Sequence, residues 1–178
     1  MNNAPAATLS VCTEGHRAVV RIAGRANFTA SVDFKKLVLR LQERGLTHIV
    51  LDLTDCLIMD STFLGVLAGL GFRTATTRAG ITQPTIELFQ PSQRVADLID
   101  NLGVTHLFKM VPRPETQAPF LPISPELDTS RVEITRTCLE AHRQLMELNP
   151  ANVPKFKDVA QFFADDLKKQ EDGHSSAN

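Results

Sequence analysis

The chain has 178 residues, of which 43% are hydrophobic and 22% are charged, and its formal net charge is −1. This length and composition indicate one well-buried domain with an attached element, and they argue against a disordered or fibrous protein. The near-neutral charge, without a run of Lys or Arg, argues against nucleic acid as a partner.

The N-terminal segment Met1–Pro5 lacks the basic and apolar regions of a secretion signal, and no stretch reaches the roughly 18 apolar residues of a membrane span. The three cysteines, Cys12, Cys56 and Cys138, are too few and too widely spaced for a disulfide framework or a zinc site. We therefore expect a cytoplasmic protein with reduced thiols, no metal, no cofactor and no direct insertion into a membrane.

The first half of the chain alternates between short β-branched runs and amphipathic stretches. The predicted elements are a strand hairpin at about 9–12 and 17–23, a helix from Ser31 to Arg44, a buried strand at 48–53, a loop at 54–60 and a helix at 61–77. In the first helix, Phe34, Leu37, Val38 and Leu41 follow the i, i+3, i+4, i+7 spacing of one apolar face.

The alternation continues with a strand at 85–89, a helix capped by Ser92 and closed by Gly103, and a last strand at 107–111. Strands that alternate with helices form mainly parallel sheets, because the helices serve as crossover connections. The fold class is therefore predicted to be α/β, with helices packed against a mainly parallel sheet.

Beyond this core, prolines at 112, 114, 119, 122 and 125 predict a stiff connector over residues 112–129 that joins no strand ladder. Two apolar stripes then predict a C-terminal helical hairpin over residues 130–170, docked on the core or on another protomer. The stripes consist of Ile134, Cys138, Ala141, Leu145 and Leu148, and of Phe156, Val159, Ala160, Phe163 and Leu167.

The segment from Leu51 to Leu67 carries an apolar strand, an acidic loop and the run Asp60-Ser61-Thr62-Phe63-Leu64-Gly65 at a helix start. It resembles the signature of STAS domains of the anti-sigma-factor-antagonist type, in which Asp-Ser-Ser/Thr-Gly-Leu-Gly leads into a helix. Residues 91–98, with Leu102-Gly103 and Leu107-Phe108 after them, are similar to the last helix and strand of that family. The resemblance covers residues 8–111, so the expected STAS domain has those limits.

The resemblance implies a protein-binding module that is switched by phosphorylation of Ser61 and thereby releases a sigma factor or related regulator of transcription. The implied partners are an anti-sigma factor acting as serine kinase and a phosphatase acting on phosphoserine, and a homodimer is possible. Physical chemistry agrees, because a phosphate is tolerated at a helix N-terminus. Its added charge beside Asp60 and near Asp55 would oppose a partner that fits the neutral form.

One residue departs from the family pattern, because Phe63 stands where the family usually has glycine. Phe63, Val66 and Leu70 form a stripe distinct from that of Leu64 and Leu67. We expect this second stripe to face a partner or to be covered by the C-terminal helices. The candidate binding residues are Asp60, Thr62, Phe63, Val66 and Leu70.

Two other interpretations of Ser61 remain open. Asp60-Ser61 is also an ordinary helix cap, and some relatives act as scaffold or accessory subunits in stressosome-like or lipid-transport complexes without a phosphoserine cycle. An enzyme is not expected, because the chain has no Gly-x-Ser-x-Gly elbow and no motif that indicates a histidine base partnered with an acid. His142 in the C-terminal helices has no metal-ligand spacing.

Overall fold

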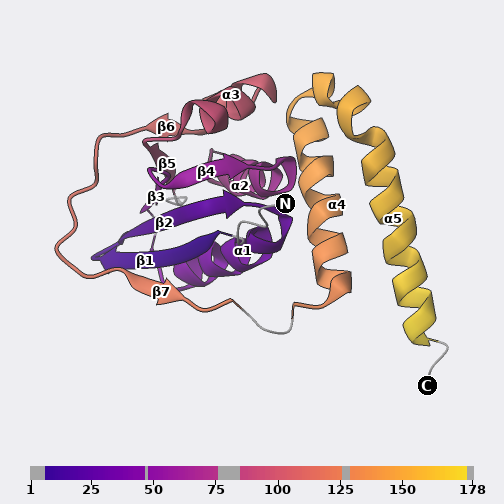
Figure 1. The fold of residues 1–178 in the computed structure, drawn as a ribbon, viewed down its shortest axis with the longest axis horizontal. Helices are drawn as coiled ribbons and strands as arrows, with labels where there is room; N and C mark the ends of the chain where they lie inside the picture. The colour runs from indigo at the N-terminus through magenta and orange to yellow at the C-terminus, as the bar shows by residue number, and fades with distance from the viewer. Residues whose placement is uncertain (1–6, 47, 76–84, 126–128, 176–178) are drawn as a thin grey trace.

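In the computed structural model, which describes residues 7–46, 48–75, 85–125 and 129–175, a seven-stranded sheet carries helices on one side and a helical hairpin at one end (Figure 1). The strands are β1 (Thr8–Glu14), β2 (Arg17–Ala26), β3 (His48–Asp52), β4 (Cys56–Met59), β5 (Thr85–Phe89), β6 (Lys109–Met110) and β7 (Leu121–Ile123). The helices are α1 (Phe28–Glu43), α2 (Ser61–Ala75), α3 (Gln93–Asn101), α4 (Arg131–Leu148) and α5 (Val153–Ser175), with 3-10 turns at Thr105–Leu107 and Pro150–Asn152.

The sheet has the order β6-β5-β3-β2-β1-β7, and β4 pairs with β2 beyond the end of β3. The β2–β3, β2–β4, β3–β5 and β5–β6 pairs are parallel, and β1 is antiparallel to both β2 and β7. Parallel neighbours need long crossovers, which α1, α2 and α3 provide. The predicted α/β class with a mainly parallel sheet is confirmed.

Helix α1 buries the predicted face, since Phe34, Leu37, Val38 and Leu41 all lie in the main apolar core. The helix begins before the predicted Ser31, because the Asn27 side chain caps it by accepting a hydrogen bond from the amide of Ala30 at 3.1 Å. Buried aliphatic side chains of β2, β3 and β5 meet this face from the sheet. The core therefore lies between the sheet and α1, α2 and α3.

Two predicted segments differ in the structure. The expected loop at 54–60 contains the short strand β4, whose four residues are too few to show a period in the sequence. The expected strand at 107–111 is reduced to β6, because residues 105–107 form a 3-10 turn. Both changes leave the strand preceding Ser61 and the helix following it in their predicted order.

The prediction that the proline-spaced connector joins no ladder is wrong, because β7 extends the sheet beside β1. Leu121 lies opposite Val11, and Pro122 lies opposite Ser10. A proline is tolerated there because an edge strand uses only part of its N–H groups for pairing. The sheet therefore continues beyond the expected domain limit at residue 111.

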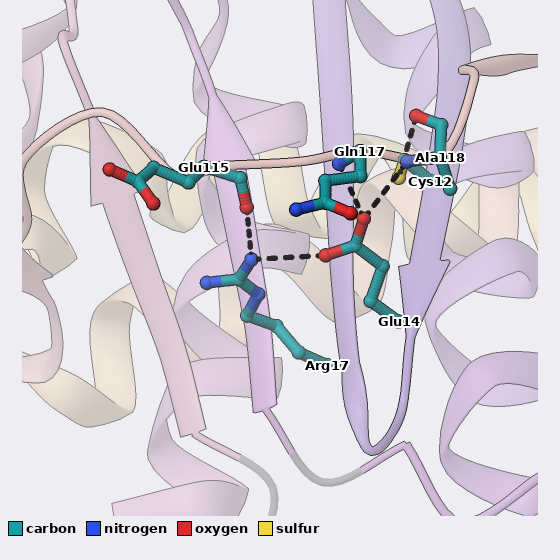
Figure 2. Close-up of polar contacts among 6 residues, drawn as sticks. All are labelled: Cys12, Glu14, Arg17, Glu115, Gln117 and Ala118. Carbon is teal, nitrogen blue, oxygen red and sulfur yellow. Dashed lines mark hydrogen bonds and ion pairs between the residues drawn. The ribbon is translucent and has the colours of Figure 1, made fainter.

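Polar contacts hold the connector against the β1–β2 hairpin, as Figure 2 shows. The Glu14 carboxylate accepts hydrogen bonds from the amides of Gln117, at 2.6 Å, and Ala118, at 2.9 Å. These bonds to the amides of Ala118 and Gln117 lower the pKa of Glu14. Arg17 pairs with Glu14 and donates to the carbonyl oxygen of Glu115. The connector is thus a bound segment of the fold.

The connector also covers the face of the sheet opposite the helices. Val19, Val50 and Phe89 form a small apolar cluster there, with Val111 and Phe120 packed against it. The Arg21 guanidinium lies 4.0 Å from the centre of the Phe120 ring, a cation–π contact. The single connector therefore shields part of a face that would otherwise be open to water.

The C-terminal hairpin docks on the α/β core, which is one of the two locations that the sequence left open. Helix α4 packs against α2 and α1, and α5 packs on the outer side of α4 (Figure 1). Ala141 and Leu145 of α4 are buried in the same apolar core as the sheet residues. This docking brings α4 to the start of α2, where the candidate switch residue lies.

Candidate functional site

Asp60 lies between β4 and α2 and caps the helix. One carboxylate oxygen, Oδ1, accepts the amide of Phe63 at 2.8 Å, and the other, Oδ2, accepts the amide of Phe28 at 2.7 Å. One side chain therefore joins the starts of α1 and α2. Burial raises the pKa of Asp60, and the hydrogen bonds from the backbone amides of Phe63, Phe28 and Thr62 act in the opposite direction.

Ser61 is the first residue of α2 and is partly buried. Its Oγ lies 3.1 Å from Nε2 of His142 in α4, and Nδ1 of the same ring lies 2.8 Å from the carbonyl oxygen of Cys138. A carbonyl oxygen can only accept, so Nδ1 carries the proton and the Ser61 hydroxyl donates to Nε2. Burial lowers the pKa of His142, which favours this neutral imidazole.

His142 is surrounded by the aromatic residues of α5. Its ring centre lies 5.0 Å from that of Phe156 and 5.9 Å from that of Phe163, and the side chain is only 4% exposed. The same ring thus contacts α2 through Ser61 and α5 through two phenylalanines. The sequence gives no local signal of this contact, because the two residues are 81 positions apart and only the docking of α4 brings them together.

The predicted binding residues do not share one surface. Thr62 is buried, with Oγ1 3.9 Å from Sγ of Cys138. Phe63 is fully buried and stacks on Phe34 of α1, so its side chain lies in the core instead of facing a partner. Within the first turn of α2, Phe63 points towards α1, whereas Thr62 points towards α4.

Val66 and Leu70 lie on the side of α2 that α4 approaches. Both are largely buried and line a groove of about 110 Å³ between the two helices. The stripe was expected to face a partner or to be covered by the C-terminal helices. Val66 and Leu70 lie beside the C-terminal helices. Their role in partner binding remains a prediction.

Two exposed apolar side chains lie on segments that adjoin Asp60. Leu57 of β4 is 62% exposed and Phe28 at the start of α1 is 46% exposed. The Phe28 amide binds Asp60, and Leu57 precedes that residue closely in the chain. This end of the domain therefore presents apolar surface beside a carboxylate and a hydroxyl.

The pairing of Ser61 with His142 resembles a nucleophile and its base, but the third group is a backbone carbonyl, and His142 is almost completely buried. This burial favours a structural hydrogen bond. Among the described residues, no group of three or more His, Cys, Asp and Glu side chains could hold a metal ion. The described helices include none with the length and apolar character of a bilayer span.

Comparison with known proteins locates this site within a recognised domain. A family model described as the STAS domain matches residues 9–117, so the matched region ends before α4. No curated protein sequence matches the chain significantly.

Two solved structures are similar. One is a Thermotoga maritima protein described as a candidate anti-sigma factor antagonist, with 19% identity, a TM-score of 0.50, and coverage of 58% of this chain and 85% of that chain. The other is the anti-sigma factor antagonist SpoIIAA in its unphosphorylated form, with 17% identity, a TM-score of 0.48, and coverage of 60% and 89%. At 19% identity, the first likeness shows the fold.

Proposed function

Because the chain belongs to the STAS domain family, we propose that it is a protein-binding module of the anti-sigma-factor-antagonist type, switched by phosphorylation of Ser61. The observation that carries this proposal is the Asp60-Ser61 pair at the start of α2, where Asp60 caps the helix and Ser61 remains partly exposed. The neighbouring hydroxyl of Thr62 is buried. Ser61 is therefore the hydroxyl of this pair that a kinase would modify.

The position suits a charge switch. The first amides of a helix and its dipole stabilise an anion, so a phosphate on Ser61 would not by itself disrupt α2. A partner that fits the neutral surface would meet about −1.5 to −2 units of new charge next to the Asp60 carboxyl. Binding would weaken while the fold persists.

The exposed side chains of Leu57 and Phe28 supply apolar surface beside this charge. A partner that covers them would be held by apolar burial and would report on the state of Ser61. The partner that we propose is an anti-sigma factor acting as serine kinase in the cytoplasm, with a phosphatase that restores the free hydroxyl. Capture of this anti-sigma factor by the chain would release a sigma factor or a related regulator.

The hydrogen bond from Ser61 to the buried His142 supports a second candidate. A hydroxyl that is already bound within the chain suits a scaffold or accessory subunit, whose partners bind without a phosphoserine cycle. In that case the apolar surface at Leu57 and Phe28 serves assembly alone.

Phosphorylation distinguishes the two candidates. The full chain is incubated with ATP and each anti-sigma-type kinase encoded in the same genome, and the peptide containing Ser61 is analysed by mass spectrometry. Phosphate on Ser61 that is absent from Ser61→Ala supports the switch. Ser92→Ala is the matched control, because Ser92 also lies at a helix start. Stable complexes without any phosphate support the scaffold.

A further inference from the structure

Helix α4 lies unusually close to α2 because Gly65 has no side chain. A Cβ atom on Gly65 would lie 2.5 Å from the carbonyl oxygen of Ala141 and 2.8 Å from the Ala141 Cβ. Cys138 and His142, which flank Ala141 on α4, lie against Thr62 and Ser61. The close approach of the two backbones therefore positions α4 over the start of α2.

In the observed side-chain conformation of Ser61, the contact with His142 leaves no room for a phosphate. Nε2 stands 3.1 Å from the Ser61 oxygen, so a phosphorus atom and its three further oxygens would occupy the space of the imidazole. Phosphorylation would also remove the hydroxyl proton that Ser61 donates to Nε2. Phe156 and Phe163 pack against His142 and limit its movement within the docked hairpin.

Apolar contacts, among them those of the buried Ala141 and Leu145, supply most of the docking of α4 on the core, and the ion pairs add little. Lys35 pairs with Glu140 at 2.6 Å, and Lys36 pairs with Glu133 at 2.8 Å. All four side chains reach solvent, where such pairs contribute at most about 1 kcal/mol each. A groove of about 110 Å³ beside Gly65 is open to solvent and is lined by residues of α1, α2 and α4, so water reaches the edge of this interface.

The far end of the hairpin is held more firmly. Nδ2 of the fully buried Asn152 donates to the carbonyl oxygens of Leu102, at 2.9 Å, and Leu145, at 3.0 Å. The bond to Leu102 fastens the α4–α5 turn to the end of α3, and the bond to Leu145 holds the turn against α4. The hairpin could thus leave Ser61 while remaining attached through this turn.

We propose that the C-terminal hairpin, α4 and α5, is a removable cover of Ser61, and that a seated α4 and a phosphate on Ser61 exclude each other. The docked hairpin covers part of the Ser61 side chain and binds its hydroxyl, and a modified Ser61 keeps the hairpin displaced. The element moved by the switch is then the hairpin, which lies outside the matched residues 9–117. The biological role of this movement rests on the proposed function of Ser61.

The test places phosphoserine at position 61 of the full chain during translation, so that no kinase is needed. Hydrogen–deuterium exchange is then measured in α4 and, as a reference for the core, in β3 and β5. We expect exchange in α4 to accelerate about tenfold or more, which corresponds to a loss of about 1.4 kcal/mol in docking. The matched control is phosphoserine at Ser92, which should leave α4 unchanged.

Three results would overturn the proposal. Unchanged α4 exchange would mean that the phosphate fits beneath the seated helix, and slower exchange would mean that it pairs with a protonated His142. Equal acceleration in β3 and β5 would mean that the hairpin is not a separable element. In a His142→Ala background the effect of phosphoserine should shrink, and an undiminished effect would reject His142 as the excluding group.

This result is independent of the kinase experiment. If α4 undocks when phosphoserine stands at position 61 but no kinase modifies Ser61, the removable cover is supported and the phosphoserine switch is rejected. If a kinase phosphorylates Ser61 but α4 stays protected from hydrogen exchange, the switch is supported and the removable cover is rejected.

Discussion

The ring of Phe63 stacks on the ring of Phe34, with centroids 4.9 Å apart and planes inclined by 26°. Both side chains are fully buried, and the contact joins the first turn of α2 to the middle of α1. Phe63 takes the place of a glycine that is usual in the STAS signature. In this chain that position therefore contributes to the core beneath Ser61.

Replacing Phe63 by alanine should lower the free energy of unfolding by about 3–5 kcal/mol, because a buried ring is lost and a cavity remains. Urea denaturation of both proteins measures the difference. The control is Leu57→Ala, whose side chain is 62% exposed and whose stability should change by no more than about 0.5 kcal/mol. A Phe63→Ala loss as small as that of the control would contradict core packing.

Gly65→Ala should undock α4, although alanine is the better helix former by about 1 kcal/mol. The new Cβ would meet the Ala141 carbonyl at 2.5 Å, and backbone cannot move aside as a side chain can. Exchange in α4 should rise, together with cleavage by protease between β7 and α4. Gly69→Ala is the control, because its Cβ meets only the flexible Gln144 side chain at 3.1 Å. Equal effects of the two variants would argue against the close approach.

Asn152→Ala should destabilise the protein by about 1–3 kcal/mol, because two buried hydrogen bonds, to the carbonyl oxygens of Leu102 and Leu145, are lost at about 0.5–1.5 kcal/mol each. Thermal or urea denaturation of the full chain measures this loss. Lys155→Ala removes an exposed donor to the carbonyl oxygen of Asn101 from the same region and should cost less. A loss of stability in Lys155→Ala as large as that in Asn152→Ala would contradict this prediction.

Acidification should weaken the fold through His142. Burial lowers its pKa in the folded state, so the unfolded chain binds the proton first as pH falls below the ordinary histidine value of about 6.5. Stability is then lost progressively from that pH down to the folded-state pKa. Asp60 acts with the opposite sign, because burial raises its pKa and the folded state binds its proton more readily.

Unfolding free energies of the wild type and His142→Gln between about pH 7 and 5 separate the histidine from the other groups. The decline should be shallower in the variant, which has no imidazole to protonate. Parallel curves for the two proteins would show that His142 does not couple folding to pH.

Ser61→Asp should weaken binding to the cognate anti-sigma kinase about a hundredfold, which corresponds to about 2.7 kcal/mol of charge repulsion and desolvation. Ser61→Ala should preserve binding and prevent phosphorylation. Calorimetric titration of the same kinase with all three proteins provides the comparison, and melting curves control for the fold. Equal affinities, or a phosphate on Thr62, would reject Ser61 as the switch.

Elements whose signals are local could be predicted from the sequence alone. The spacing of Phe34, Val38 and Leu41 identified the buried face of α1, and the alternation of strands and helices predicted the mainly parallel sheet. Ser92 was recognised as a helix cap, and its side chain accepts the amide of Val95. Such features depend on residues within one or two turns of each other, so a single sequence displays them.

The surroundings of Ser61 could not be predicted in this way, because they depend on contacts between separate helices. The hydrogen bond to His142, the approach of Ala141 to Gly65 and the stacking of Phe63 on Phe34 each join separate helices. Periodicity shows that a helix has an apolar face but does not identify the element that the face will meet. That choice depends on how well the assembled surfaces fit, and here the fit places α4 over the first turn of α2.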